Sequence, residues 1–464
     1  YQTRRGDIKR VNGKGEIMTF ETKGKENNGA IYGRRSDWQD LYSIAKKYYE
    51  ALLADPGNAQ FHLTDPRGAS DKSGRTFNNP YQYFFEQMHM DDAIYADESI
   101  YEYPMQQGGG NDGRPYSFGR PSSGGSKAAY PCKSYGQGRI NPAYFYGVFD
   151  PNDMRRDVSI TMTGSNGKGV EKLIPFVPNS KAEGGGLTLN KWDENRQANP
   201  WVAAQRKSGI NGPYMRMSEV YLGYAEVCAA LGDVVTGKQY LKTVRERSFP
   251  QGLANTDAFI ASFGNDLVRA IIEERGFEYA GEGDRRWTLI RSGYLPEDIK
   301  RIKDMTKAMM DGLATKGYYE FENGNIISAY IWTKLVDAKT IYGHRLTAQC
   351  PTDKVNDPVL YPGWRGQKDN WEEMGLNYGS STPATNLAIK GLFEIVSEEE
   401  AASLESQGYA KVNWGIDLVD YRDEYDKYLF WDYDYVSAPI YLWPFTPNVM
   451  AAGGFTNGYG FKQE

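Results

Sequence analysis

The chain has 464 residues, of which 25% are charged and 40% are hydrophobic, and its formal net charge is −6. These values are typical of a globular protein with one large domain or two to three ordinary ones. No basic stripe is present, which argues against nucleic-acid binding, and no apolar run reaches transmembrane length.

Tyrosine is unusually frequent, with 35 Tyr beside 10 Trp, and aromatic residues make up 14% of the chain. These side chains combine a flat apolar face with a polar tip, so they suit amphipathic ligands such as sugars. The same residues could instead pack between helices. Composition alone leaves both interpretations open.

The first predicted element is a helix from Ser36 or Asp37 to Ala54, with an apolar stripe that includes Trp38 and Tyr42. A short helix over 81–90 and an extended strand over 99–104 follow. Residues 106–138 are rich in Gly, Ser, Pro and Arg, and such long loops in a compact protein are usually either functional or disordered. A further strand is predicted over 158–163.

Helical periodicity is strongest after residue 214. Helices over 215–231 and 236–247 are joined by a turn in which Gly232 acts as a left-handed cap, which predicts an antiparallel helical hairpin. Helices are also predicted over 267–280 and 297–314. Residues 317–335 read as a strand or hairpin that turns at Asn323-Gly324.

Glu274, Glu278 and Glu282 fall on one face of the 267–280 helix and its continuation. Together with Arg275, Arg285 and Arg291 they could form an acid/base or anion-binding cluster. We favour a structural role, in which buried ion pairs tie one helix to the next.

The cysteines and histidines predict neither a disulfide framework nor a metal site, because they are few and widely spaced. Cys228 lies on an apolar helix face and is predicted to be a core residue. No cofactor is expected, although the Asp- and Asn-rich segment Asp150–Asp157 would accommodate a structural calcium. The residues concerned are Cys132, Cys228, Cys350, His62, His89 and His344.

A second motif closes the chain over Pro444–Phe461 and ends with Asn457, Gly458 and Tyr459. The first motif runs through the helical segments after residue 214, at Arg216, Glu219, Tyr221, Leu222, Ala225, Glu226, Val244, Arg245, Arg247, Glu274, Arg275, Glu278, Glu282, Gly283, Arg285, Trp287, Leu289, Ile290 and Arg291. Both motifs resemble those of the SusD/RagB family of outer-membrane nutrient-binding lipoproteins. The departures are Thr288, where the family usually has Asp, and the absence of the family's Gln and Pro from the terminal motif.

The resemblance implies a mainly α, SusD-like fold with tetratricopeptide-like hairpins, long irregular loops and a few short strands. Residues 1–464 are expected to form a single domain that lacks the family's N-terminal segment and its lipid anchor. Its expected parts are a helical-repeat part (36–54), a loop-rich ligand-binding part (105–213), the signature helices (214–292) and a C-terminal extension with the terminal motif (293–464).

The resemblance also implies a function. The protein is expected to capture oligosaccharides on the extracellular face of the outer membrane and to deliver them to a SusC-like TonB-dependent β-barrel transporter. By position, the ligand would contact the segment before the signature, with Trp192, Trp364 and Trp371 as further candidates. The predicted ligand-binding residues are Tyr116, Phe118, Tyr130, Tyr135, Asn111, Asp112, Arg114 and Arg120.

Three other functions remain as alternatives. The same fold could capture peptides for a RagA-like transporter, although the Tyr-rich loops favour a glycan. A helical glycoside hydrolase would need two carboxylates across a cleft, and no such pair or other catalytic arrangement is evident in the sequence. A helical scaffold for protein assembly would bury all of its aromatic residues.

Overall fold

The computed structural model describes residues 10–11, 17–18, 38–66, 79–89, 95–109, 113–122, 134–165, 171–178, 185–193, 206–337, 385–429 and 445–454. Strands β1 (Arg10–Val11) and β2 (Ile17–Met18) form a short antiparallel pair at the start of the chain.

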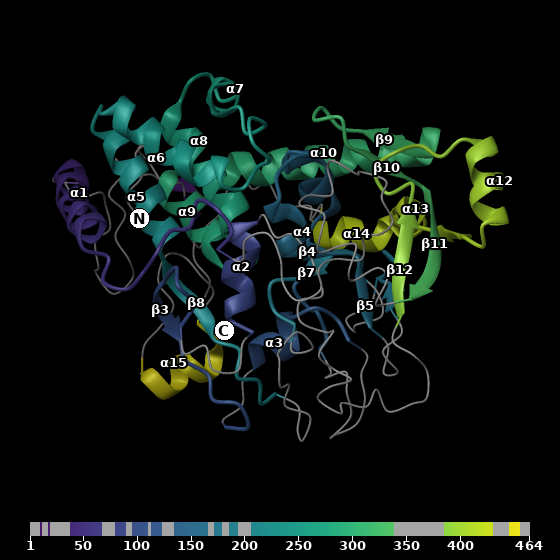
Figure 1. Ribbon diagram of the computed structural model, residues 1–464, viewed down its shortest axis with the longest axis horizontal. Coiled ribbons are helices and arrows are strands. Elements are labelled where there is room, and N and C mark those ends of the chain that lie inside the picture. Colours follow the sequence, from purple (N-terminus) through teal and green to yellow (C-terminus); the bar gives the residue numbers. More distant parts are fainter. Residues whose placement is uncertain are drawn as a thin grey trace.

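Helices dominate one side of the molecule, at the left and top of Figure 1. Helix α1 packs against α5, which forms a hairpin with α6, and α8 packs against both members of the hairpin. The bounds are α1 (Trp38–Ala54), α5 (Met217–Ala230), α6 (Val234–Glu246), α7 (Thr256–Ala261), α8 (Leu267–Glu278) and α9 (Asp284–Ser292).

The α5–α6 hairpin confirms the predicted turn. Gly232 has a φ of +91°, a left-handed conformation that glycine adopts without a steric penalty. Asp233 then caps α6, because its side chain accepts a hydrogen bond from the Thr236 amide at 3.2 Å. Cys228 is fully buried on the inner face of α5, as expected for a core residue.

Helix α10 (Leu295–Lys316) crosses the molecule and leads to a second part at the right of Figure 1. There β9 (Tyr318–Glu320) and β10 (Ile326–Ser328) form the predicted hairpin, and Gly324 in its turn has a φ of +85°. β11 (Tyr330–Asp337) is the central strand of an antiparallel sheet between β12 (Thr385–Lys390) and β13 (Ala410–Asn413). The helices of this part are α12 (Glu398–Ser406), α13 (Gly415–Asp420) and α14 (Arg422–Leu429).

Short elements make up the rest of the described chain. Strand β3 pairs with β8, β4 with β7 and β5 with β6, all antiparallel. The bounds are α2 (Pro80–Gln87), β3 (Ser99–Tyr103), α3 (Gly113–Phe118), the π-helical turn η1 (Tyr144–Val148), α4 (Arg155–Ser159), β4 (Ile160–Thr161), β5 (Thr163–Ser165), β6 (Glu171–Leu173), β7 (Thr188–Leu189), β8 (Gly212–Arg216) and α15 (Pro447–Gly453).

The predicted strand over 158–163 is wrong at its start, because α4 extends to Ser159 and the strand begins at Ile160. The Asp153 carboxylate accepts a hydrogen bond from the Arg155 amide at 3.0 Å, which favours a helical turn at this point. Arg155 and Arg156 are both buried, so ion pairs and ring contacts hold this turn in place.

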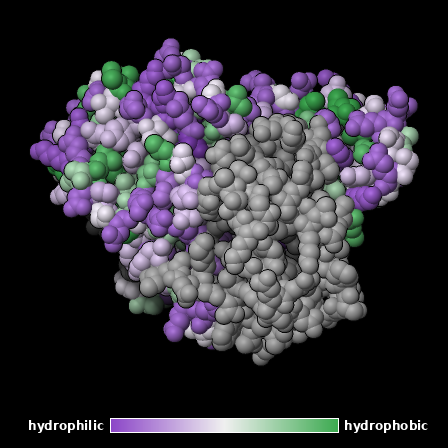
Figure 2. Space-filling view, viewed as in Figure 1, coloured by the Kyte–Doolittle hydropathy of each residue, from purple (hydrophilic) through white to green (hydrophobic). Residues whose placement is uncertain are grey.

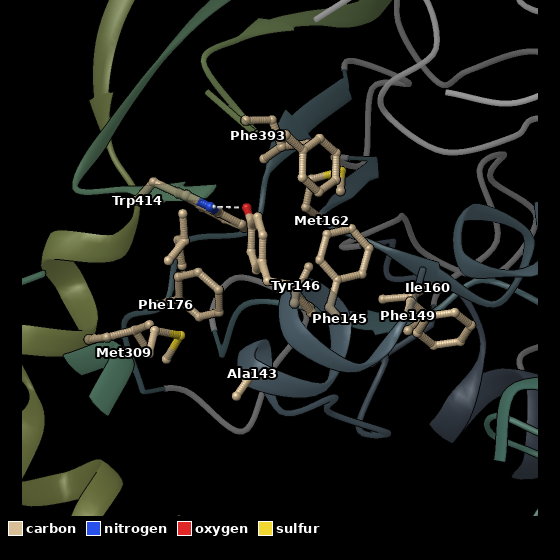
Figure 3. Packing of buried hydrophobic residues seen from close by; sticks show 14 of the residues in the cluster. Ala143, Phe145, Tyr146, Phe149, Ile160, Met162, Phe176, Met309, Phe393 and Trp414 are labelled. Carbon is tan, nitrogen blue, oxygen red and sulfur yellow. Dashed lines mark hydrogen bonds between the residues drawn. The ribbon is translucent and has the colours of Figure 1, made fainter. Parts of the chain in front are cut away.

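The largest hydrophobic core joins the middle of the molecule to the C-terminal part, as Figure 3 shows. Tyr146 from η1 lies close to Trp414, whose indole N–H donates to the tyrosine hydroxyl at 2.8 Å. Phe176 contacts the Trp414 ring at 4.3 Å between centroids. Burial raises the pKa of Tyr146 well above its ordinary value, so this hydroxyl stays neutral.

The described elements confirm the predicted mainly α class with a few short strands. On the face seen in Figure 2, the described residues are mostly hydrophilic, with separate hydrophobic patches. None of the helices within the described ranges is both long and apolar enough to cross a membrane.

Candidate functional site

The acidic residues of α8 are buried in ion pairs, as the structural interpretation predicted. Glu278 accepts hydrogen bonds from Arg155 at 3.0 Å, Arg216 at 2.5 Å and Arg247 at 2.8 Å. Although burial alone would raise the pKa of Glu278, Arg216 and the other two guanidinium groups hold it well below its usual range. This carboxylate therefore connects three separate segments of the chain.

Two further acids extend this network. Glu274 pairs with Arg155 at 2.7 Å and with Arg245 at 2.9 Å. Glu282 pairs with Lys191 at 2.6 Å and with Arg216 at 3.0 Å. Burial lowers the pKa of Lys191 to about 8, even though Glu282 opposes the shift.

A second cluster links α8 to α9 and α10. Burial by itself would raise the pKa of Glu273, but Arg285, Arg301 and Arg269 together lower it to about 2. Arg275 pairs with both Glu219 and Asp284 at 2.6 Å. Thr288, the departure from the family pattern, donates its hydroxyl to Asp284 at 2.9 Å and accepts from Arg275 at 3.2 Å.

Arg291 pairs with Glu226 of α5. The acids and arginines of the signature therefore hold one helix to the next by forming ion pairs with each other.

Of the predicted ligand-binding aromatics, Tyr116 lies in the interior at 5% exposure. Its ring meets that of Tyr135 edge-on at 5.0 Å, and the Arg206 guanidinium lies 4.4 Å from its centroid. Burial raises the pKa of Tyr116. Because only Tyr135 of this pair is partly exposed, the Tyr116 ring supports a neighbouring surface rather than offering a free face.

Arg120 is also buried, at 1% exposure, where it pairs with Glu171 and donates to the Thr163 hydroxyl at 3.2 Å. Its main-chain N–H donates to the carbonyl of Trp192, which is buried as well. Arg120 and Trp192 hold loops together in the interior. The prediction that their side chains lie on an open surface is therefore wrong.

Besides the partly exposed Tyr135, the predicted site residues that reach the surface within the described ranges are Phe118, with 46% exposure, and Arg114, in part. Both belong to the short helix α3. The other predicted candidates fall outside the described residues; these are Asn111, Asp112, Tyr130, Trp364 and Trp371.

Three tyrosines that the sequence analysis did not select form an exposed surface on the β3–β8 ribbon. Tyr101, Tyr103 and Tyr214 are 52%, 54% and 75% exposed. The rings of Tyr101 and Tyr214 meet nearly at a right angle, 87°, with their centroids 5.5 Å apart. We call these three residues the tyrosine surface.

Alternation along β3 creates this surface. Tyr101 and Tyr103 point to solvent, whereas Glu102 between them is buried. Glu102 accepts hydrogen bonds from the Ala96 amide and from the Asn211 side chain, both at 2.8 Å. The inner face of the ribbon is thus fixed by polar contacts, and the outer face is left with aromatic rings.

Arg114 connects α3 to the tyrosine surface, because its guanidinium carbon lies 5.9 Å from the centroid of the Tyr103 ring. It packs over Gly212, where a Cβ would fall 1.3 Å from the Arg114 Nη1. A glycine at this position of β8 is therefore required for the arginine to lie where it does.

The sequence contained a signal for the tyrosine surface. The predicted strand 99–104 places Tyr101 and Tyr103 on one face, two residues apart, which is the pattern of a half-exposed strand. Tyr214 could not be found in this way, since its position beside Tyr101 depends on the pairing of β3 with β8, in which Tyr101 lies opposite Met215 and Glu102 opposite Pro213.

The two described histidines, His62 and His89, are engaged in polar contacts within the protein. His89 contacts the Phe85 carbonyl at 2.6 Å and accepts from the Asp193 amide at 3.0 Å, while His62 lies 3.2 Å from Asp97. Within the described ranges, no group of three or more His, Cys, Asp or Glu side chains is arranged as a metal site. In the Asp150–Asp157 segment, Asp153 is ion-paired with Arg155 at 2.7 Å. Cys132, Cys350 and His344 lie outside the described residues.

Comparison with known proteins identifies the family. The model of the SusD family matches residues 60–444, which is most of the chain, and the protein belongs to this family. The SusD-like protein P25 from Formosa agariphila is 28% identical over 160 residues, which are 34% of this chain and 26% of that protein.

Similar solved structures include two surface glycan-binding proteins. The one from Bacteroides uniformis is 20% identical, with a TM-score of 0.37 over 55% of this chain and 46% of its own. The one from Bacteroides thetaiotaomicron, in complex with laminarihexaose, is 19% identical, with a TM-score of 0.38 over 56% of this chain and 52% of its own. This chain spans about half the length of these two proteins and about a quarter of the curated relative.

Proposed function

We propose that this protein captures oligosaccharides at the cell surface and passes them to a SusC-like TonB-dependent transporter in the outer membrane. Membership of the SusD family supports nutrient capture as the general role. The tyrosine surface is the observation that favours an oligosaccharide as the ligand. We propose that this surface binds the oligosaccharide and that the protein does not hydrolyse it.

The geometry of the tyrosine surface suits a sugar chain. The rings of Tyr101 and Tyr214 stand at 87° to each other, so a sugar that stacks on one ring meets the edge of the other. The apolar C–H faces of the sugar would contact the rings, and its hydroxyls would bond to the tyrosine tips and to Arg114. Because Glu102 and Asn211 fix the ribbon beneath, the rings are positioned before the ligand arrives.

The proposal is tested by affinity electrophoresis and calorimetry of the purified protein against a panel of polysaccharides and peptide digests. One glycan should bind the unmodified protein, and the double variant Tyr101→Ala/Tyr214→Ala should lose that binding. Tyr48→Ala is the matched control, since Tyr48 on α1 is 70% exposed but lies outside the tyrosine surface.

Three results would contradict parts of the proposal. Binding of peptides alone would assign the protein to peptide capture. Release of shorter sugars from the bound glycan would overturn the non-enzymatic role. Glycan binding that survives in the double variant would exclude the tyrosine surface as its site.

Delivery to a transporter is tested separately, by purifying the protein in mild detergent from outer membranes of the organism that produces it. A β-barrel protein should co-purify in a fixed ratio. Recovery of the glycan-binding protein alone under conditions that preserve other outer-membrane complexes would contradict this part of the proposal.

A further inference from the structure

Two adjacent cations, Arg206 and Lys207, lie in the segment that leads into β8, and Arg114 lies against the tyrosine surface itself. We call these three residues the basic rim. Arg206 precedes Gly212, the first residue of β8, by six positions, so at most about 20 Å of extended chain separates them. Gly212 is the residue over which Arg114 packs, and it pairs with Tyr103. The basic rim is therefore within reach of an oligosaccharide that lies on the tyrosine rings.

Hydrogen bonds fix the segment that precedes β8. The Gly108 amide donates to the Lys207 carbonyl at 3.0 Å, and the Lys207 ammonium donates to the Gly109 carbonyl at 2.8 Å. Nearer the strands, the Met105 amide donates to the Asn211 side chain at 2.8 Å. These bonds continue the β3–β8 ribbon beyond its regular ladder, so the cations and the tyrosines are carried by one ribbon.

Arg206 has a backbone conformation that is unusual for a residue with a side chain. Its φ is +61°, in the left-handed region, and residues held in such conformations cluster at ligand-binding positions. The guanidinium carbon lies 4.4 Å from the centroid of the Tyr116 ring, and the side chain hydrogen-bonds to the Tyr116 hydroxyl. Arg206 is nevertheless an exposed residue, so a ligand in solvent can reach its guanidinium.

The groups that hold these two cations are neutral. The Tyr116 hydroxyl stays protonated at neutral pH because burial raises its pKa, and Lys207 bonds to a main-chain carbonyl. Among the described residues, no carboxylate forms an ion pair with Arg206 or Lys207. Exposed lysines elsewhere do have acidic partners, as Lys238 has in Asp257. The positive charge of the rim is therefore not neutralised within the described part of the chain.

The surrounding surface also lacks exposed acids. The described segments 99–109, 113–118 and 206–216 contain one acidic residue, Glu102, and it is buried beneath the ribbon. This part of the surface is thus positive, although the formal net charge of the protein is −6. An accessible guanidinium binds carboxylates and other oxyanions through charge-assisted hydrogen bonds, and a positive surface attracts such ligands.

From these observations we infer that the oligosaccharide bound by the tyrosine surface is anionic, with carboxylate or sulfate groups that pair with the basic rim. The inference rests on the proposed function, because the same ligand contacts the tyrosines. Its sugar rings stack on Tyr101 and Tyr214, and its charged groups pair with Arg206 and Lys207. Since the Arg206 side chain is already held against Tyr116, its ordering costs little on binding.

The test is calorimetry with two acidic probes and their neutral counterparts. The probes are an oligogalacturonate and its methyl ester, and a sulfated galactan oligosaccharide and its desulfated form. At least one acidic probe should bind about tenfold or more tightly than its neutral counterpart. Raising NaCl from about 0.05 M to about 0.5 M should weaken the binding of that acidic probe and leave its neutral counterpart unaffected.

The double variant Arg206→Gly/Lys207→Gln should weaken binding of the acidic probe by about tenfold or more, and it should not change the affinity for the neutral counterpart. Glycine adopts the left-handed conformation of residue 206 without strain, so the variant should remain folded, which circular dichroism checks. Lys242→Gln/Lys300→Gln is the matched control. It removes the same charge from two lysines that are 50% and 61% exposed on other helices, and it should leave binding unchanged.

The outcomes separate this inference from the proposed function. Preference for one acidic probe over the other identifies the anion as carboxylate or sulfate. If neutral forms bind as tightly as acidic ones, and Tyr101→Ala/Tyr214→Ala abolishes both, the inference is overturned and the proposed function stands. If no glycan binds, both are overturned.

Two results with the variants would also overturn the inference. One is acidic binding that persists in the folded Arg206→Gly/Lys207→Gln variant, because the basic rim would then have no part in it. The other is acidic binding that is unchanged in Tyr101→Ala/Tyr214→Ala, because the charged ligand would then bind apart from the tyrosine surface.

Discussion

Arg216 donates to the main-chain carbonyl of Glu278 at 2.8 Å and to its carboxylate at 2.5 Å. Arg216 is the last residue of β8, and Tyr214 lies two residues earlier on the same strand with its ring in solvent. The ion-pair network of the helices thus holds the strand that presents an exposed ring. Arg216 of the signature motif therefore supports the strand on which the candidate site lies.

Replacing Arg216 with Met should destabilise the protein by about 3–5 kcal/mol, because Glu278, Glu98 and Glu282 lose a shared buried partner. Urea unfolding followed by circular dichroism measures the change. Arg422→Met provides the control, since its pair with Asp311 is partly exposed and such pairs contribute about 0–1 kcal/mol. Equal effects of the two substitutions would show that the buried network contributes no more than a surface pair.

Stability should depend on the protonation of Glu273 at acid pH. Its pKa in the folded protein is about 2, below the ordinary value of 4.5, so the unfolded chain takes up the proton first as the pH falls. The stability that Glu273 contributes is therefore fully present above the ordinary pKa, and it is lost as the pH falls toward the folded pKa.

Urea unfolding at a series of pH values from about 6 to about 3 tests this dependence. Glu273→Gln should lower stability near neutral pH and make the acid dependence shallower. Glu399→Gln, at the exposed start of α12, should leave the slope unchanged. A slope in Glu273→Gln identical to that of the unmodified protein would mean that other carboxylates account for the acid dependence.

Gly212→Ala should weaken glycan binding at the tyrosine surface while leaving the protein folded. The new Cβ would lie 1.3 Å from the Arg114 Nη1, so the guanidinium must leave its place near Tyr103. The obstacle is the far end of a flexible side chain, and moving it costs the fold little. We expect a several-fold rise in Kd by calorimetry with the glycan that binds the unmodified protein.

Gly113→Ala is the control for this substitution, because a Cβ there meets only the Ser117 hydroxyl at 4.0 Å. It should change neither stability nor affinity. If Gly212→Ala binds as tightly as the unmodified protein, Arg114 has no part in recognition.

The helices were predictable from sequence because their signals are local. Gly232 and Asp233 mark the hairpin turn, and the spacing of Glu274 and Glu278 places both on one side of α8. The site was predicted less well, because burial depends on contacts between distant segments. Arg120 sits in a Gly-, Ser- and Pro-rich segment typical of a surface loop, yet Glu171 and Asp193 draw it inside.

Tyr214 is the opposite case, an exposed residue whose exposure its local sequence does not predict. It lies just before the signature helix, and nothing in its immediate sequence distinguishes an exposed ring from a buried one. Only the antiparallel pairing of β3 with β8 brings it beside Tyr101. Strand pairing of this kind joins residues more than a hundred positions apart, which periodicity cannot detect.

Two buried threonines should respond in opposite ways to replacement by Val. The Thr288 hydroxyl bonds to Asp284 and Arg275, so Thr288→Val removes satisfied contacts and should cost about 1–3 kcal/mol. The Thr256 hydroxyl is without a partner among the described residues, so Thr256→Val removes an unpaired buried group. It should leave the unliganded protein equally stable or more stable by about 1 kcal/mol.

Urea unfolding of both variants without added sugar measures the difference. A loss of stability in Thr256→Val as large as that in Thr288→Val would mean that its hydroxyl already has a hydrogen-bond partner in the folded protein.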